Sequence, residues 1–152
     1  IVNIGDEDSV KIGMPVITEV GFAGIVTNVS DNFAIVKTLH NTDLKIAVKN
    51  QRSGFEGILS WDGKRLYIKD VPTTADIEKG DRFITSEFST LVPPLIPVGI
   101  ISEKGTTISG VLSKVYLTPF VKINGVRNVF VLQMIKNAQI DSLELNLLLP
   151  KN

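Results

Sequence analysis

The 152-residue sequence contains no cysteine and only one histidine, His40. Without cysteine the chain has no disulfide, no thiol nucleophile and no cysteine-ligated zinc or iron–sulfur site. A single histidine also excludes metal sites that need several imidazole ligands. We therefore expect no metal ion and no cofactor, and a fold that depends on its hydrophobic core.

The sequence also lacks an excess of charge, because 16 Lys and Arg residues balance 16 Asp and Glu residues. This balance argues against a protein that binds nucleic acid or anionic lipid by bulk electrostatics. No apolar run reaches the roughly 18 residues of a membrane helix, and no signal-peptide pattern is present. Because the sequence begins at Ile1 rather than methionine, we expect it to be a piece of a longer protein, and any membrane anchor of that protein would lie outside these residues.

Residues that favour helices are scarce, with 5 Ala and 2 Met against 17 Val, 18 Ile and 11 Thr. Val, Ile and Thr fit a pleated surface better than a helix. Apolar and polar residues alternate in Leu44–Lys49 and Arg65–Lys69, which is typical of half-buried antiparallel strands. Asp62-Gly63, between two such stretches, predicts a hairpin turn. The predicted strands span about residues 15–20, 23–29, 33–39, 44–49, 56–61, 65–70, 82–86, 98–102, 107–113, 114–118 and 127–134.

Two segments of the chain resemble each other. Val10–Thr18 aligns without a gap with Ile77–Thr85, so that Gly13 matches Gly80. Further along, Gly24-Ile25-Val26 resembles Gly99-Ile100-Ile101. The shared pattern is a glycine turn, a strand, and a second strand that opens with glycine. We interpret it as two related small β-domains, against the alternative that such a pattern arises by chance in a β-rich sequence.

The resulting fold prediction is all-β, with two small packed six-stranded-type β-barrels arranged like a chymotrypsin-like double barrel without a catalytic triad. We assign residues 1–54 with 114–135 to the first barrel, 55–113 to the second, and 136–152 to a C-terminal tail. The first half then has 76 residues and the second 59. Both are near the lower limit of independent stability, so the halves should pack on each other. A cleft between them is the natural place for a ligand or partner.

Catalytic motifs are missing. The one candidate base, His40, lies in a polar turn beside Asp43, which favours a solvated loop residue over a triad member. No serine lies in a Gly-x-Ser-x-Gly frame, and the sequence has no Walker A loop, no Gly-x-Gly-x-x-Gly and no evident pair of catalytic carboxylates. We therefore predict no catalytic residues and a protein that is not an enzyme. The serines considered as nucleophiles are Ser60, Ser86, Ser89 and Ser113.

A set of short motifs, in a fixed order over about residues 10–133, resembles the extracytoplasmic domain of the MreC family of rod shape-determining proteins. The chain departs from the family pattern at Glu87 and Leu95, where glycine is usual at or near these positions, and both departures concern the geometry of the loop from Glu87 to Pro97. The residues that carry the resemblance are Gly13–Thr18, Gly24–Thr27, Arg52–Gly54, Gly57–Leu59, Asp70–Pro72, Asp76-Ile77, Gly80-Asp81, Ile84–Ser86, Ile96–Gly99, Pro119-Phe120 and Val129–Val131.

The resemblance implies a fold of two β-barrels without catalysis, and a scaffold role in cell-wall elongation. It implies a periplasmic, or extracytoplasmic, domain of an inner-membrane-anchored protein, with an N-terminal membrane helix and a coiled coil that this sequence does not contain. The partners it implies are a class B penicillin-binding transpeptidase, MreD, RodA and the MreB machinery, and it also implies possible self-association.

A scaffold of this kind needs exposed apolar anchors on a rigid frame. The segment Phe88–Ile96 is rich in apolar residues and stiffened by proline, so ordering it on binding would cost little. We take Phe88, Leu91 and Leu95 as candidate partner contacts, against the alternative that they cap the open end of the second barrel. Trp61 is a further candidate, against the alternative of a barrel lid.

Three functions remain open from the sequence. The first is a scaffold that binds and activates the transpeptidase. The second is a degenerate serine hydrolase, which requires His40 within hydrogen-bonding distance of a serine. The third is a module that binds peptidoglycan or another carbohydrate, which requires an exposed aromatic platform.

Overall fold

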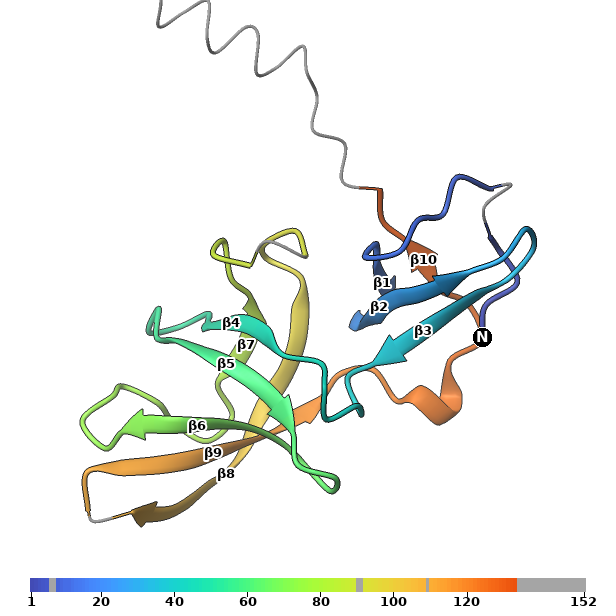
Figure 1. Cartoon of the computed structure of the whole chain (residues 1–152). Helices are drawn as coiled ribbons and strands as arrows, with labels where there is room; N and C mark the ends of the chain where they lie inside the picture. Colours follow the sequence, from blue (N-terminus) through green and yellow to red (C-terminus); the bar gives the residue numbers. More distant parts are fainter. Residues whose placement is uncertain (6–7, 90–91, 109, 134–152) are drawn as a thin grey trace, which may run out of the picture.

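The computed structural model describes residues 1–5, 8–89, 92–108 and 110–133, and their regular secondary structure is almost entirely β-strand, joined by turns and loops (Figure 1). A short 3-10 helix, η2 (Ile123–Gly125), lies between the last two strands. The predicted all-β class is confirmed. The strands are β1 (Pro15–Thr18), β2 (Gly21–Val29), β3 (Ala34–Thr38), β4 (Ile46–Asn50), β5 (Glu56–Trp61), β6 (Leu66–Pro72), β7 (Arg82–Thr85), β8 (Pro97–Ile108), β9 (Leu112–Pro119) and β10 (Phe130–Val131).

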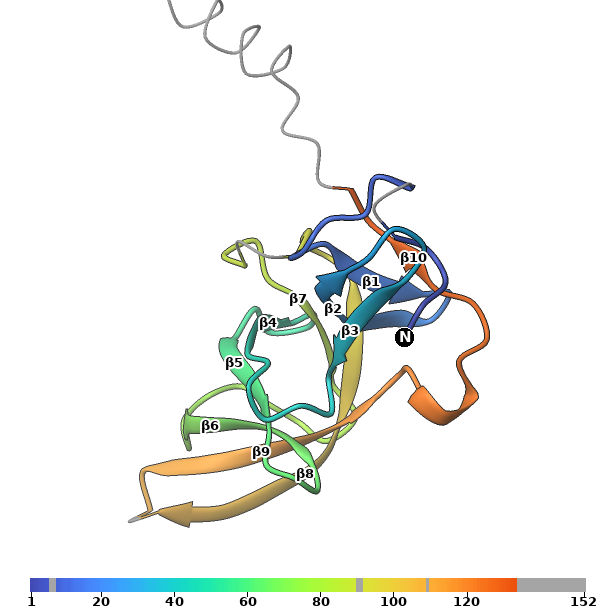
Figure 2. The same ribbon diagram turned by 45° about the vertical axis from the view of Figure 1, so that its right-hand side comes forward.

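Six of these strands close into a barrel in the order β4-β5-β6-β9-β8-β7 (Figure 2). The alternation predicted for residues 44–49 is confirmed in β4, where Ile46 and Val48 are buried and Ala47 and Lys49 are partly exposed. Burial of such inward-facing side chains drives closure, and closure leaves no strand of the barrel with an unpaired edge. The largest buried side chains of this core are Phe22, Phe83, Leu59, Leu66, Ile68 and Ile101.

The hairpin predicted at Asp62-Gly63 joins β5 to β6. Gly63 has a left-handed backbone with φ of 100°, which glycine adopts without steric cost. The carboxylate of Asp62 accepts hydrogen bonds from the backbone N–H groups of Arg65 and Lys64, each at 2.7 Å. These bonds lower the pKa of Asp62 and fix the turn.

The remaining strands form a four-stranded sheet in the order β10-β1-β2-β3. The last strand pairs with the first, with Val16 opposite Val131, so the sheet joins the two ends of the described chain. Its own small core includes Val10, Val16, Val26 and Val121.

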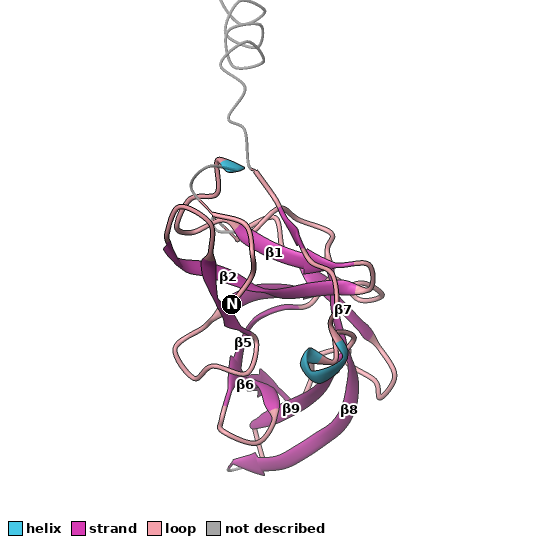
Figure 3. Cartoon of the chain, turned by 90° about the vertical axis from the view of Figure 1, so that its right-hand side faces the viewer, coloured by secondary structure: helices cyan, strands magenta, loops and turns pink. Residues whose placement is uncertain are grey.

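The sheet packs directly on the barrel. Figure 3 shows the sheet and the barrel as the two halves of the molecule. Strand β2 is buried on both faces: Phe22 and Ile25 belong to the barrel core, whereas Ala23 and Val26 belong to the sheet core. A Cβ added at Gly21 would collide with the carbonyl oxygen of Pro97 in β8, so only glycine permits this close approach.

The two similar segments adopt the same local structure, as their sequences predict. Gly13 and Gly80 both have left-handed backbones, with φ of 92° and 93°. The N–H of Gly13 donates to Val26 O at 2.8 Å, and the N–H of Gly80 donates to Ile101 O at 3.0 Å. Each glycine turn therefore leads into the first strand of a β-unit, β1 or β7, and is held by the strand that follows, β2 or β8.

The structure divides the strands between the two halves differently from the predicted boundaries. Strands β4 and β9, which fall in residues 1–54 and 114–135 for most of their length, belong to the closed barrel, and the other half is an open four-stranded sheet within the described residues. Alternation shows that a strand has one buried face, but it does not show which neighbours the strand pairs with. Residues 98–102 and 107–113 were expected as separate strands, but β8 runs continuously to Ile108 and turns near Gly110. The tail, 136–152, lies outside the described residues.

Candidate docking surface

The loop between β7 and β8 is fixed at its base by Thr85, which is fully buried. The Thr85 hydroxyl donates to Pro93 O at 2.6 Å and accepts from the N–H of Ile96 at 2.9 Å. The Thr85 backbone N–H donates to Ile96 O at 2.9 Å, and its carbonyl accepts from the N–H of Leu95 at 3.0 Å. One threonine therefore holds both ends of the turn that presents Leu95.

Ser86 provides a second anchor for the same loop, and it is also fully buried. Its N–H donates to Ala47 O at 3.0 Å, and its hydroxyl donates to the Glu56 carboxylate at 3.2 Å. The same hydroxyl accepts from the N–H of Phe88 at 3.1 Å. Val92 is completely buried and ties the middle of the loop to the barrel core.

The side chains held by this frame point away from it. Phe88 is 71% exposed and Leu95 is 70% exposed, so neither packs inside the barrel. Leu95 also has a left-handed backbone, with φ of 68°, a conformation that costs a branched non-glycine residue free energy. The third predicted contact, Leu91, lies outside the described residues. The role of these three side chains as partner contacts stays a prediction.

Glu87, where the chain departs from the family pattern, connects the loop to β4. Its carboxylate lies 3.4 Å from the Lys49 ammonium group. A hydrogen bond from its own backbone N–H, together with Lys49, lowers the pKa of Glu87. Both groups are partly exposed, so this ion pair adds little stability.

Trp61, the fourth predicted contact, is half-buried against the barrel core. Its ring meets the His40 imidazole edge-to-face, with 4.6 Å between centroids. Among the described residues, no hydrogen bond joins this imidazole to a serine hydroxyl, since Ser86 and Ser113 donate to Glu56 and to a backbone carbonyl. His40 is thus placed with an aromatic neighbour rather than with a nucleophile.

A clamp around Arg52 was not identified as a unit from the sequence. The Arg52 guanidinium donates to both carboxylate oxygens of Asp81 at 2.9 and 2.8 Å, and to both oxygens of Asp76 at 3.0 and 2.8 Å. Asp81 also accepts from the Asn50 side-chain amide at 2.8 Å and from the N–H of Glu78 at 2.9 Å. The clamp joins the turn after β4 to the loop before β7.

These hydrogen bonds, with Arg52 as the largest cause, hold the pKa of Asp81 well below its usual range, and those from Arg52 also lower the pKa of Asp76. Asp81 is buried, whereas the Arg52 side chain is 41% exposed and hydrated. The arrangement therefore suits a structural tie between two loops. The sequence contained a signal for this clamp, because Arg52, Asp76 and Asp81 all lie in the motifs that carry the family resemblance.

The two tyrosines on the outer face of the barrel are covered by cations. The Arg65 guanidinium lies 3.5 Å from the centre of the Tyr116 ring, and the Lys114 ammonium lies 5.0 Å from the centre of the Tyr67 ring. Arg65 is held there by Glu103 at 2.7 Å. Tyr67 and Tyr116 are cross-strand neighbours, but neither offers the bare flat face on which a sugar ring stacks.

The sequence also predicts a cleft between the two halves of the molecule. A hollow of about 680 Å³ lies beside the connections that join barrel and sheet, lined by residues from the β3–β4 connection, the end of β9 and η2. His40 and Ile123 lie on its walls.

Within the described ranges, no group of three or more His, Cys, Asp or Glu residues is placed to hold a metal ion. Over the same residues, no helix combines the length and the hydropathy that crossing a membrane requires.

Comparison with known proteins places the chain beside one family. Residues 1–133 match the family described as "Rod shape-determining protein MreC, barrel core". The cell shape-determining protein MreC of Haemophilus influenzae is 29% identical over 134 residues, which cover 87% of this chain and 38% of that protein. The MreC protein of Listeria monocytogenes is 30% identical over 135 residues, which cover 85% of this chain and 46% of that protein. The chain thus spans less than half the length of these relatives.

Solved structures show the same fold. The crystal structure of MreC from Pseudomonas aeruginosa superposes with a TM-score of 0.78 at 29% identity, covering 86% of each chain. A second structure, a complex between penicillin-binding protein PBP2 and MreC from Helicobacter pylori, superposes with a TM-score of 0.63. It is 16% identical and covers 77% of this chain and 74% of that chain, a level at which the likeness concerns the fold alone.

Proposed function

The chain belongs to the MreC family of rod shape-determining proteins, and from this membership we propose that it acts as a non-enzymatic docking scaffold of the cell-wall elongation machinery. Its partner in this proposal is the class B penicillin-binding transpeptidase, which it meets on the outer side of the cytoplasmic membrane. MreD, RodA and the MreB filament are the further members of the assembly that the scaffold serves.

The observation that carries the proposal is the loop between β7 and β8. It combines two large exposed apolar side chains, Phe88 and Leu95, with a base that Thr85 and Ser86 fix through buried hydrogen bonds. Apolar anchors on a rigid frame lose little conformational entropy on binding, which is the property that a docking surface needs. The complex of PBP2 with MreC from Helicobacter pylori supports a partner of this class.

Docking would act on the transpeptidase by conformational selection. If the partner exchanges between active and inactive conformations, the scaffold shifts that equilibrium only by binding the active one more tightly. The scaffold then needs no reacting group of its own, and the clamp around Arg52 serves to keep its loops in place.

The direct test is titration calorimetry between the purified domain and the purified extracytoplasmic domain of the class B transpeptidase from the same organism. We expect saturable binding, and we expect Phe88→Ala to weaken it about tenfold or more, as truncation of an interface anchor does. Ile58→Ala is the matched control, because Ile58 is 51% exposed on β5, outside the loop. Absence of binding by a domain whose circular dichroism shows the folded state would refute the proposal.

A further inference from the structure

A hollow of about 250 Å³ lies directly beside the exposed loop, between β7, the start of β8 and the chain just after β9. Ile84, Pro97 and Phe120 provide its apolar walls, and Leu95 of the loop borders it. The hollow is therefore continuous with the surface that carries the proposed function, and its lining suits an apolar side chain.

Arg82 lines this hollow, and no ion pair with a carboxylate of another described residue neutralises its charge. Its guanidinium lies 5.5 Å from the centre of the Phe120 ring. Among the ion pairs given by the described residues, the arginine pairs belong to Arg52 and Arg65, and none includes Arg82. The Arg82 side chain is exposed, so its charge is available to an approaching group.

A second hollow, of about 380 Å³, lies on the other side of Phe120, toward the sheet. Val20 and Val126 line it together with two cationic residues, Lys122 and Arg127, and one acidic residue, Glu19. We call the two hollows with Phe120 between them the Phe120 groove. The groove carries more positive than negative side chains, although the chain as a whole has a net charge of zero.

We propose that the Phe120 groove binds a segment of the partner in which acidic residues flank an apolar side chain. The inference rests on the proposed function, so the partner is the extracytoplasmic domain of the class B transpeptidase. The apolar side chain of that segment occupies the hollow beside Ile84 and Phe120. Its carboxylates pair with Arg82 on one side and with Lys122 and Arg127 on the other, since complementary charges fix the register of such a segment.

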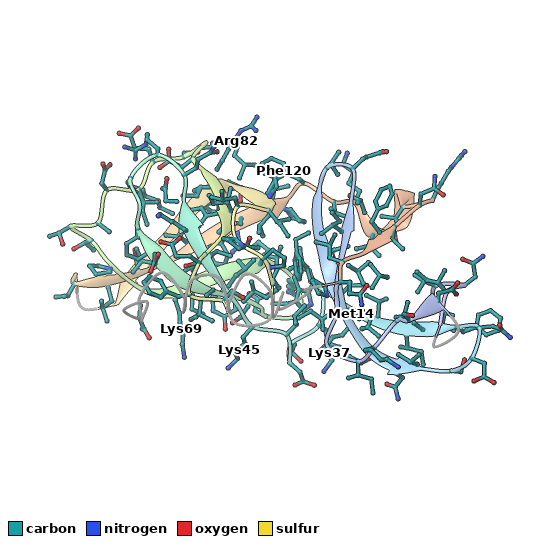
Figure 4. All side chains as sticks on the ribbon, turned by 90° about the horizontal axis from the view of Figure 1, so that it is seen from above. Met14, Lys37, Lys45, Lys69, Arg82 and Phe120 are labelled. Atoms are coloured by element: carbon teal, nitrogen blue, oxygen red, sulfur yellow. The ribbon has the colours of Figure 1, made fainter. Side chains whose placement is uncertain are left out.

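The opposite side of the molecule supplies a matched control. Figure 4 shows Arg82 and Phe120 along one side of the molecule, whereas Lys37, Lys45 and Lys69 lie along the other. A triple variant Arg82→Glu, Lys122→Glu, Arg127→Glu and a triple variant Lys37→Glu, Lys45→Glu, Lys69→Glu change the net charge by the same amount. The two variants therefore reverse the same number of positive charges at different places on the molecule.

The experiment titrates wild-type domain and both triple variants with the transpeptidase ectodomain at low and at moderate salt, after thermal unfolding has shown that each variant is folded. We expect the groove variant to bind about tenfold or more weakly than the control variant at low salt, and the wild-type affinity to fall as salt rises. If the wild type binds and the two variants bind with equal affinities, the proposal that the Phe120 groove is the binding site is wrong, whereas the proposed scaffold function still holds. If the wild type itself does not bind, the proposed function fails first.

Discussion

The β1–β2–β3 unit of the sheet and the β7–β8–β9 unit of the barrel begin with the same local structure and end in different surroundings. In the first, the N–H of Val26 donates to Met14 O at 2.9 Å, and in the second the N–H of Ile101 donates to Asp81 O at 2.9 Å. Beyond that, within the part of the chain that the structure describes, β3 pairs with one full strand and has only an isolated bridge from Val2 on its other side. In contrast, β9 pairs with both β6 and β8. The same motif therefore builds an open edge or a closed wall, depending on the strands that surround it.

Two further differences follow the same division. Met14 and Asp81 occupy equivalent positions, but only Asp81 joins the clamp around Arg52. The connection between β1 and β2 consists of Glu19 and Val20, whereas the connection between β7 and β8 spans residues 86–96 and carries the candidate docking surface. The barrel unit is thus the more constrained of the two, and the exposed loop is built onto it.

The largest expected difference between the units concerns their equivalent core positions, Phe83 and Val16, both of which are almost completely buried. We expect Phe83→Ala to lower the free energy of unfolding by about 4 kcal/mol and Val16→Ala to lower it by about 2 kcal/mol. The larger side chain leaves the larger cavity, and the closed barrel around Phe83 cannot collapse to fill it. Urea denaturation followed by circular dichroism measures both values. A Val16→Ala cost equal to that of Phe83→Ala would contradict the greater constraint of the barrel.

The next difference concerns Gly24 and Gly99, which lie in the second strand of each unit opposite Val16 and Phe83. A Cβ at Gly24 would collide with Lys37 O, and a Cβ at Gly99 would lie 2.5 Å from Thr118 O. Strand β3 can shift outward because it lies at the edge of the sheet, whereas β9 is held on both sides. We expect Gly99→Ala to cost about 3 kcal/mol and Gly24→Ala about 1 kcal/mol, which chemical denaturation can test. Equal costs would show that the sheet is as rigid as the barrel.

The sequence predicts the parts of this fold that depend on local chemistry. Alternation in residues 44–49, the Asp62-Gly63 turn and the paired glycines Gly13 and Gly80 all concern residues that are neighbours along the chain. Strand partners were harder to assign, because β4 and β9 have apolar faces that fit either half equally well until distant strands are placed. The two carboxylates of the Arg52 clamp lie 24 and 29 residues from the arginine, and no local pattern brings them together.

The candidate site shows the same limit. Phe88 and Leu95 could be selected because apolar residues are unusual in an exposed loop, and their exposure agrees with that choice. The left-handed backbone of Leu95 could not be predicted from the sequence, because leucine rarely adopts this conformation. At this position the conformation depends on the hydrogen bonds that Thr85 makes with the loop. Arg82 and Phe120 come together only because β7 and the chain after β9 both flank β8.

A smaller expected effect is the pH dependence of stability that Asp81 contributes, which the equivalent residue Met14 cannot contribute because its side chain does not ionise. The pKa of Asp81 is lowered in the folded state, so the stability it contributes is present above the unfolded value of about 3.9 and is lost as the pH falls below that value. We expect Asp81→Asn to lower the free energy of unfolding by about 1–2 kcal/mol at pH 7, a modest value because Arg52 stays partly hydrated. The deficit should shrink between pH 4 and pH 2, measured by urea denaturation across that range. A deficit that is the same at both ends of the range would mean that the carboxylate charge contributes nothing.

The smallest expected effect on stability concerns Leu95, which lies in the loop that only the barrel unit has. In Leu95→Gly the left-handed backbone is no longer strained, which stabilises the folded state, while the added freedom of glycine favours the unfolded chain by a similar amount. We therefore expect the free energy of unfolding to change by less than about 0.5 kcal/mol, and binding of the transpeptidase ectodomain to weaken about tenfold. Thermal unfolding and calorimetric titration of the same preparation measure the two quantities together. A loss of stability above about 1 kcal/mol without a change in affinity would mean that Leu95 contributes to the fold of the loop and not to binding.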